Sequence, residues 1–109
     1  MPKSDIELLH IGVEELRKEI TIKIADLIGK IDGHRKKILV VYTRFLIEHQ
    51  GKDELEAMDE HVDRCLCGLR NEIVGWKNEI AQHKLWIEKL EKLEKLQHVD
   101  VAGIRKYYL

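Results

Sequence analysis

A stretch of about 45 residues without a proline, residues 53–97, constrains this chain more than any other feature. Its apolar side chains recur in steps of three, four or seven residues, which places them on one face of an α-helix. An unbroken helix of this length would span roughly 68 Å at 1.5 Å per residue. That is about five times the radius of gyration of a compact domain of this size, ~13 Å. The helix must therefore either break or find a second chain to cover it.

The composition favours an ordered helical protein. Charged residues make up 36% of the chain, against about 25% in ordinary globular domains. Apolar residues make up 44% and the formal net charge is only −1, which is not the composition of a disordered chain. A length of 109 residues fits one domain, so we expect residues 1–109 to form a single helical domain. Because a net charge near zero gives little repulsion between copies, self-association is favoured at neutral pH.

The first helix is predicted over residues 5–31. Ser4 and Glu7 have the spacing of a capping box, in which the serine is the N-cap. Apolar residues then recur with helical periodicity. The dipeptide Asp32-Gly33 is a turn signal, so we expect the helix to end just before it.

A second helix is predicted over residues 34–49. Its β-branched run is strand-like by propensity alone, but the apolar residues that follow keep helical spacing. Leu39 and Val40 widen its apolar face, so we expect this to be the most enclosed helix of the protein.

The third and longest helix is predicted over residues 53–97. Gly68 and Gly75 each cost about 1 kcal/mol relative to alanine in a helix interior, but neither is accompanied by a proline or an Asn/Asp-rich turn. A continuous helix is therefore favoured, and the alternative is a break near Gly68–Gly75 that closes the chain into a four-helix bundle. Residues 98–109 form a short tail in which Asp100 caps a last helical turn. The predicted fold class is all-α: a coiled-coil-like helical bundle of two shorter helices and one long C-terminal helix.

An oligomer or partner surface is predicted on the long helix. If the two shorter helices fold back on each other, they cover only about 40 Å of the long one, and its apolar C-terminal part needs a second chain. Large aromatic side chains in a partly uncovered seam are typical interface anchors. His83 is the lone histidine within that seam, and we expect it to set the register of helix pairing. A haem ligand and a pH switch are the less favoured alternatives. The predicted interface residues are Trp76, Ile80, His83, Trp86, Ile87, Leu90 and Leu93.

The sequence predicts no enzyme and no cofactor. It has no nucleophile–base signature, no phosphate-binding glycine loop and no nucleotide fingerprint, and its single serine, Ser4, is used as a helix cap. His61 and Cys65 have the i,i+4 spacing of two zinc ligands, but a structural zinc site needs four, so they are weak metal candidates. Cys65 and Cys67 point about 200° apart on a helix and cannot pair with each other. Two reduced thiols are typical of an intracellular, cytoplasmic protein.

Three hypotheses for function follow. The leading one is a non-enzymatic interaction or scaffold protein that associates with itself, as a dimer or higher oligomer, or with another helical protein. The alternative is an accessory nucleic-acid-binding subunit of a larger complex that uses Arg35, Lys36, Lys37 and Arg44 to contact phosphates. The third is a metal- or haem-binding helical bundle. A membrane-spanning role is not expected, because no apolar run approaches the ~20 residues needed to cross a bilayer.

Overall fold

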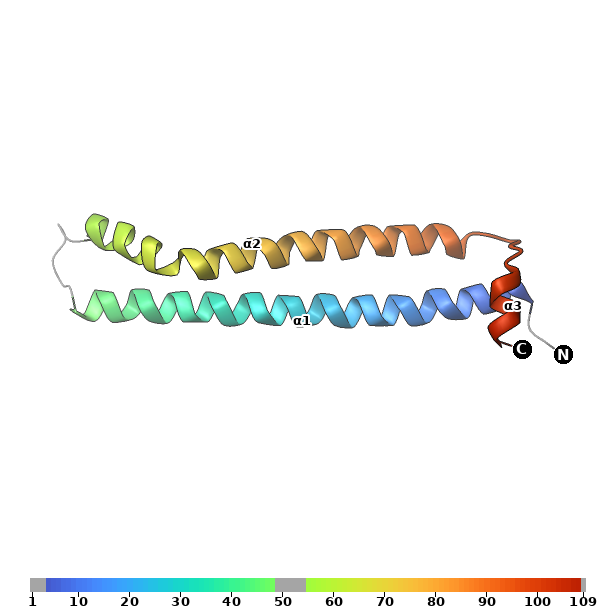
Figure 1. Ribbon diagram of the computed structural model, residues 1–109. Coiled ribbons are helices and arrows are strands. Elements are labelled where there is room, and N and C mark those ends of the chain that lie inside the picture. Colours follow the sequence, from blue (N-terminus) through green and yellow to red (C-terminus); the bar gives the residue numbers. More distant parts are fainter. Residues whose placement is uncertain (1–3, 49–54, 109) are drawn as a thin grey trace. The chain divides into compact units, whose positions relative to one another are not determined.

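Within residues 4–48 and 55–108, which a computed structural model describes, the chain forms three α-helices and no strand (Figure 1). They are α1 (Asp5–Glu48), α2 (Leu55–Glu94) and α3 (Ala102–Tyr108). The side chains of residues 55–59, 61, 62, 65 and 108 are outside the described set. The predicted all-α class is confirmed. The predicted division into two shorter helices and one long C-terminal helix is wrong, since two long helices are followed by a short one.

The N-terminus of α1 is capped by Ser4, as predicted. Ser4 lies just before the helix, and its Oγ accepts a hydrogen bond from the backbone N–H of Glu7 (3.4 Å). The carbonyl of Ser4 accepts a second bond from the N–H of Leu8 (3.1 Å). These contacts satisfy donors that a helix N-terminus otherwise leaves without a partner. The second predicted cap, at Asp53, lies outside the described residues.

The predicted turn at Asp32-Gly33 does not form, and α1 runs through it without a break. The carboxylate of Asp32 instead forms an ion pair with Lys36 one turn later (3.2 Å). This i,i+4 spacing brings two side chains together only when the helix is continuous. Ile31 is buried and His34 is half-buried, so the covered face of α1 continues across the dipeptide. One glycine in a helix costs about 1 kcal/mol, and burying two such side chains offsets more than that.

The long helix α2 is also continuous. The predicted end at residue 97 lies beyond the observed end at Glu94, whereas the predicted start at residue 53 lies outside the described residues. The alternative break near Gly68–Gly75 is wrong. The covered residues of α2 alternate in steps of three and four, and each step keeps them on one face. These buried and half-buried residues are Leu66, Leu69, Ile73, Trp76, Ile80, His83, Ile87 and Leu90.

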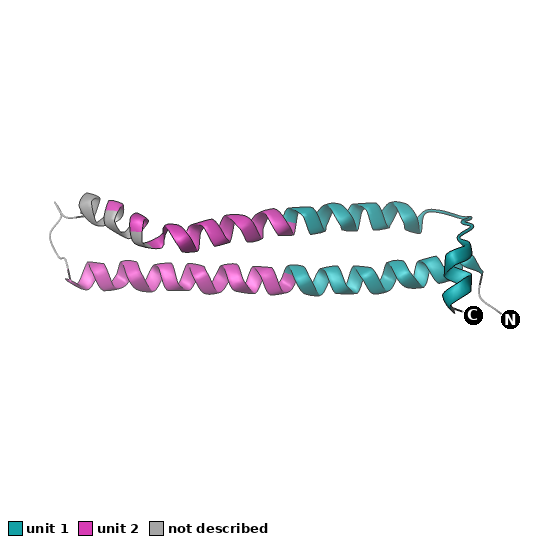
Figure 2. Cartoon of the chain, in the orientation of Figure 1, with its two compact units in different colours: residues 1–24, 81–109 teal, residues 25–80 magenta. Residues whose placement is uncertain are grey.

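The helices contribute to two compact units, shown in different colours in Figure 2. Unit 1 combines Met1–Ile24 with Ala81–Leu109, and unit 2 is Ala25–Ile80. In unit 1 the two helix segments run antiparallel, because Arg17 meets Glu94 whereas the later residue Ile20 lines a groove with the earlier residue Gln82. The core of unit 1 is Val13, Ile20 and Leu90, with Leu9, Leu16, Ile24 and Ile87 packed against them.

Unit 2 is built in the same antiparallel way from the second half of α1 and the first part of α2. His34 contacts Glu72, whereas the later Tyr42 donates a hydrogen bond from its hydroxyl to Asp63 (3.5 Å). One core cluster centres on the buried Leu66, against which Ile38, Val41, Tyr42, Phe45 and Leu69 pack. Because only the facing sides of two helices meet, a pair of this kind leaves the outer sides in solvent.

The short helix α3 is tied to the start of α1 within unit 1. The backbone N–H of Val101 donates to a carboxylate oxygen of Asp5 (3.3 Å), and Arg105 lies 3.4 Å from the other oxygen. Arg105 also donates to Asp100 (2.8 Å). A last helical turn therefore forms near the predicted place, over Ala102–Tyr108. The side chain of Asp100, predicted as its cap, accepts from Arg105 instead, and the carbonyl of Val101 accepts from the N–H of Ile104 (3.0 Å).

Continuity of α1 predicts that Gly33→Ala stabilises the protein. A Cβ added at Gly33 meets nothing within 4 Å, and no described glycine has a positive φ. The substitution should raise the free energy of unfolding by about 1 kcal/mol, because alanine has the higher helix propensity. Urea unfolding followed by circular dichroism measures this. Gly75→Ala is the matched control in α2, since a Cβ there also meets nothing within 4 Å.

If the chain turned at Asp32-Gly33 with the glycine in a left-handed conformation, Gly33→Ala would instead lower the stability. A loss of stability in Gly33→Ala together with a gain in Gly75→Ala would contradict the continuous helix.

Candidate interaction surface

A polar contact fixes the pairing of α1 and α2 in unit 2. His34 Nε2 lies 2.5 Å from Glu72 Oε2, and the imidazole lies against Trp76 with ring centroids 4.6 Å apart. The side chain of His34 is only 14% exposed. A partly enclosed histidine with one carboxylate partner and one aromatic neighbour specifies which residues of the two helices face each other. Trp76, predicted as an interface anchor, is therefore used within the chain.

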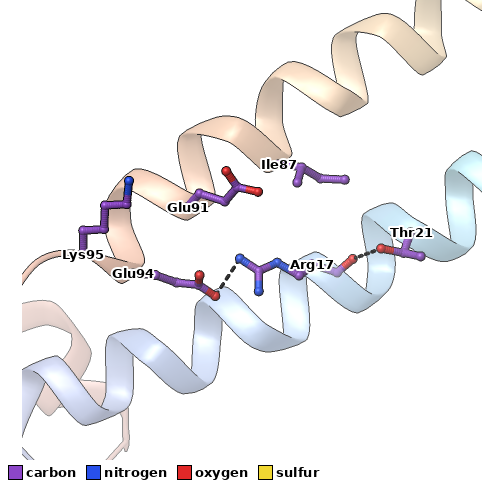
Figure 3. A pocket seen from close by; sticks show the side chains of 6 residues that line it. All are labelled: Arg17, Thr21, Ile87, Glu91, Glu94 and Lys95. Carbon is purple, nitrogen blue, oxygen red and sulfur yellow. Dashed lines mark hydrogen bonds and ion pairs between the residues drawn. The ribbon is translucent and has the colours of Figure 1, made fainter.

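One side of the helix pair in unit 1 carries a charged groove (Figure 3), lined by Arg17, Thr21, Ile87, Glu91, Glu94 and Lys95. Arg17 of α1 reaches across to Glu94 of α2, with Nη2 and Oε1 2.6 Å apart. The neighbouring Thr21 hydroxyl donates back to the carbonyl of Arg17 (2.8 Å). Arg17 Nη2 is buried and has no aligned hydrogen-bond acceptor among the described residues. The ion pair with Glu94 therefore offsets the free-energy cost of burying this charged atom. The guanidinium of Arg17 lowers the pKa of Glu94, and Glu94 raises the pKa of Arg17.

The other side of the same pair carries a more apolar groove of about 290 Å³. Leu16 and Ile20 of α1 and His83 of α2 line it, and all three are half-buried or buried. Trp86 lies at its edge and is 54% exposed. The remaining lining residues are the polar Glu19, Lys23 and Gln82. A concave apolar surface with an exposed tryptophan at its edge is suited to protein contact.

Helix geometry explains why the two grooves of unit 1 differ. At about 100° per residue, Trp86 and Glu91 of α2 are roughly 140° apart around the helix, and Thr21 and Lys23 of α1 are roughly 160° apart. The charged groove and the Trp86 groove therefore flank the seam on opposite sides. Of the residues that line the two grooves, only Trp86 is an exposed aromatic.

Comparisons with family models, with characterised proteins and with solved structures find no significant match to this chain. The surface chemistry is therefore the basis for any function assigned to it. Among the described residues, no helix is long and apolar enough to cross a membrane.

The seven predicted interface residues fall into two groups. Trp76, Ile80, His83, Ile87 and Leu90 are buried or half-buried along the covered face of α2. Ile87 and Leu90 belong to the core of unit 1. Trp86 and Leu93 are exposed. The helical period alone does not separate these groups, because an apolar seam has the same spacing whether α1 or a second copy covers it.

A second apolar surface lies on α1 in unit 2 and was not among the predicted interface residues. Leu39, Val40 and Ile47 are 64%, 55% and 69% exposed. The prediction that Leu39 and Val40 belong to the most enclosed helix is wrong, because α2 covers only the side of α1 that carries Ile38 and Phe45. The sequence indicated this surface, since Leu39 and Val40 widen the apolar face of the helix, and a wider apolar face calls for more than one neighbour.

The predicted nucleic-acid contacts Arg35, Lys36, Lys37 and Arg44 are all exposed on α1. They do not form one compact patch, because Arg35 and Lys37 point about 160° apart around the helix. Lys36 is already paired with Asp32 at 3.2 Å. Lys37 and Arg44 are seven residues apart and share one edge of the helix.

The weak metal candidates His61 and Cys65 have side chains outside the described set. Cys67 is a free, exposed thiol. Among the side chains that are described, no three His, Cys, Asp or Glu residues gather in a way that would hold a metal ion.

The lowered pKa of Glu94 makes the pairing of α1 and α2 in unit 1 sensitive to acid. A carboxylate whose folded pKa is below its unfolded value adds stability above the unfolded pKa, about 4.3 for glutamate, and this stability is lost as the pH falls through the folded pKa. We expect Glu94→Gln to destabilise the protein at pH 7 and to make little difference at pH 2. Urea unfolding of both proteins at the two pH values measures this. Glu79→Gln, at an exposed position of α2, is the control, and an equal effect of Glu94→Gln at both pH values would contradict the expectation.

Proposed function

We propose that this protein is a non-enzymatic helical interaction protein that associates with copies of itself through the Trp86 groove. The observation that carries the proposal is the exposure of Trp86 at the edge of an apolar groove between α1 and α2 of unit 1. Tryptophan buries a large area at low entropic cost and is enriched among the residues that dominate binding energy. Leu85 and Leu93, both exposed, extend the apolar surface along α2.

The charges beside the groove support a second copy as the occupant. Glu19 and Lys23 are one turn apart on the same edge of α1, and both line the groove. In a two-fold arrangement with α1 antiparallel to α1 of the other copy, Glu19 of each copy lies beside Lys23 of its partner. A two-fold interface must be self-complementary, and this edge meets that requirement. The net charge of −1 adds little long-range repulsion between copies.

Packing of the coiled-coil type within each helix pair belongs to the same proposal. The covered residues of α2 alternate in steps of three and four from Leu66 to Leu90, which is heptad spacing. In such a pair the partner helix covers the seam residues, and the side chains at the flanking positions determine what binds to the outer surface of the pair. Trp86 is at a flanking position, three residues after His83 and one before Ile87.

The first test is the mass of the protein in solution. Light scattering behind size exclusion, over a hundredfold range of concentration, should give at least twice the mass of one chain at the highest concentration. Trp86→Ala should raise the dissociation constant about 30-fold or more, as expected for a central aromatic anchor. Val74→Ala, at another exposed apolar position of α2, is the matched control and should not change it. Monomeric wild type throughout would refute self-association, and equal effects of the two substitutions would refute the location.

Charge reversal at Glu19 and Lys23 tests the two-fold arrangement. Glu19→Lys alone places two lysines beside each other at both ends of the two-fold contact, and Lys23→Glu alone does the same with two glutamates. Each single variant should therefore associate more weakly than wild type. An equimolar mixture should recover association, because in the mixed dimer every lysine faces a glutamate. A mixture that stays as weak as the two variants alone would rule out this antiparallel pairing.

A further inference from the structure

The apolar surface of α1 in unit 2 has an organised distribution of charge. Val40 and Ile47 lie along its centre, seven residues apart. Leu39 lies along one edge, and the cations Lys37 and Arg44 lie along the other. We call this surface, made of Leu39, Val40, Ile47, Lys37 and Arg44, the apolar–basic face.

The shape of the apolar–basic face fits a helix. It contains a shallow groove of about 390 Å³ whose lining residues all come from α1. Leu39, Thr43 and Ile47 form one ridge of this groove at four-residue spacing, and Val40, Arg44 and Glu48 form the other. Grooves between such ridges are the surfaces into which the ridges of a second helix pack. An amphipathic helix is therefore the occupant with matching geometry.

The charge of the face determines which helix it accepts. On this face Lys37 and Arg44 stand against one acidic residue, Glu48, because Arg35 points to another side of α1 and Lys36 is paired with Asp32. The cations outnumber the anion, so the edge favours an acidic partner over a second copy of the face. We propose that the apolar–basic face binds an acidic amphipathic helix of another protein. The apolar ridge of that helix packs on Val40 and Ile47, and its carboxylates lie along the edge formed by Lys37 and Arg44.

Nucleic acid fits this face less well. Proteins that bind single strands combine cations with exposed aromatic side chains on which bases stack. Here the exposed apolar side chains beside the cations are the aliphatic Leu39, Val40 and Ile47, whereas Tyr42 and Phe45 pack against the core cluster of unit 2. Phosphate contact alone would leave the aliphatic stripe in water.

The proposed binding does not depend on the Trp86 groove, because the two surfaces share no residue. It is tested with the full chain and a labelled synthetic helical peptide of about 21 residues. The peptide carries leucines at i, i+4 and i+7 on one face and glutamates beside them, and a second peptide replaces every glutamate by lysine. Fluorescence anisotropy at physiological salt measures binding. We expect the acidic peptide to bind and the basic peptide to bind at least tenfold more weakly.

Variants then locate the site. The double variant Lys37→Glu/Arg44→Glu should bind the acidic peptide roughly tenfold more weakly and should bind the basic peptide better than wild type does. Lys77→Glu/Lys84→Glu, two exposed cations at the same seven-residue spacing on α2, is the matched control and should leave both affinities unchanged. Val40→Asn/Ile47→Asn should also weaken binding, which separates helix docking from charge attraction alone.

Three results would overturn the proposal. The first is no binding of the acidic peptide by wild type, and the second is equal effects of the two charge-reversal variants. The third is tighter binding of a single-stranded oligonucleotide, or of vesicles containing phosphatidylserine, than of the acidic peptide. Trp86→Ala in parallel keeps the two proposals apart, because its loss of self-association should leave peptide binding unchanged.

Discussion

The antiparallel packing of α1 against α2 is the interaction on which the described structure depends, and it has a fixed geometric limit. Two helices side by side bury one face each, and here those faces are lined by residues such as Val13, Ile20 and Leu90 in unit 1 and Leu66 in unit 2. Outside those faces, apolar side chains such as Trp86 in unit 1 and Val40 in unit 2 are exposed. A chain with 44% apolar residues cannot place them all in such a seam. The exposed apolar surfaces follow from this limit.

Much of the helical structure could be predicted, because local chemistry decides it. The Ser4 cap, the proline-free periodicity of α2 and the last turn after Asp100 depend on residues close together in the sequence. The turn predicted at Asp32-Gly33 failed for a non-local reason. An isolated Asp-Gly dipeptide favours a turn by a small free energy, whereas the burial of Ile31 and the contact of His34 with Glu72 and Trp76 require the helix to continue. Those partners lie about 40 residues away in the sequence, where periodicity gives no information about contact.

The candidate surfaces were only partly predictable for a related reason. A heptad seam indicates that something covers a helix, and it does not distinguish a helix of the same chain from a second chain. Five of the seven predicted interface residues were in the seam and are covered within the chain, whereas Trp86 and Leu93, at flanking positions, are exposed. The exposed Leu39, Val40 and Ile47 lie in a segment whose apolar face is wider than one neighbouring helix covers. The identity of the covered side depends on where α2 lies, and that is a property of the fold.

Charge then separates the two exposed surfaces, although both are apolar. Beside the Trp86 groove, Glu19 and Lys23 alternate in sign along one helix edge, so a second copy supplies the complement. Along the apolar–basic face, the cations Lys37 and Arg44 outnumber the acidic Glu48, so the proposed occupant is an acidic helix. The hydrophobic effect is non-directional and favours any apolar partner. Specificity comes from unfavourable contacts, such as like charges, that reject the other partners. Under the two proposals, the self-complementary surface joins copies of this chain and the basic surface joins them to a different, acidic partner.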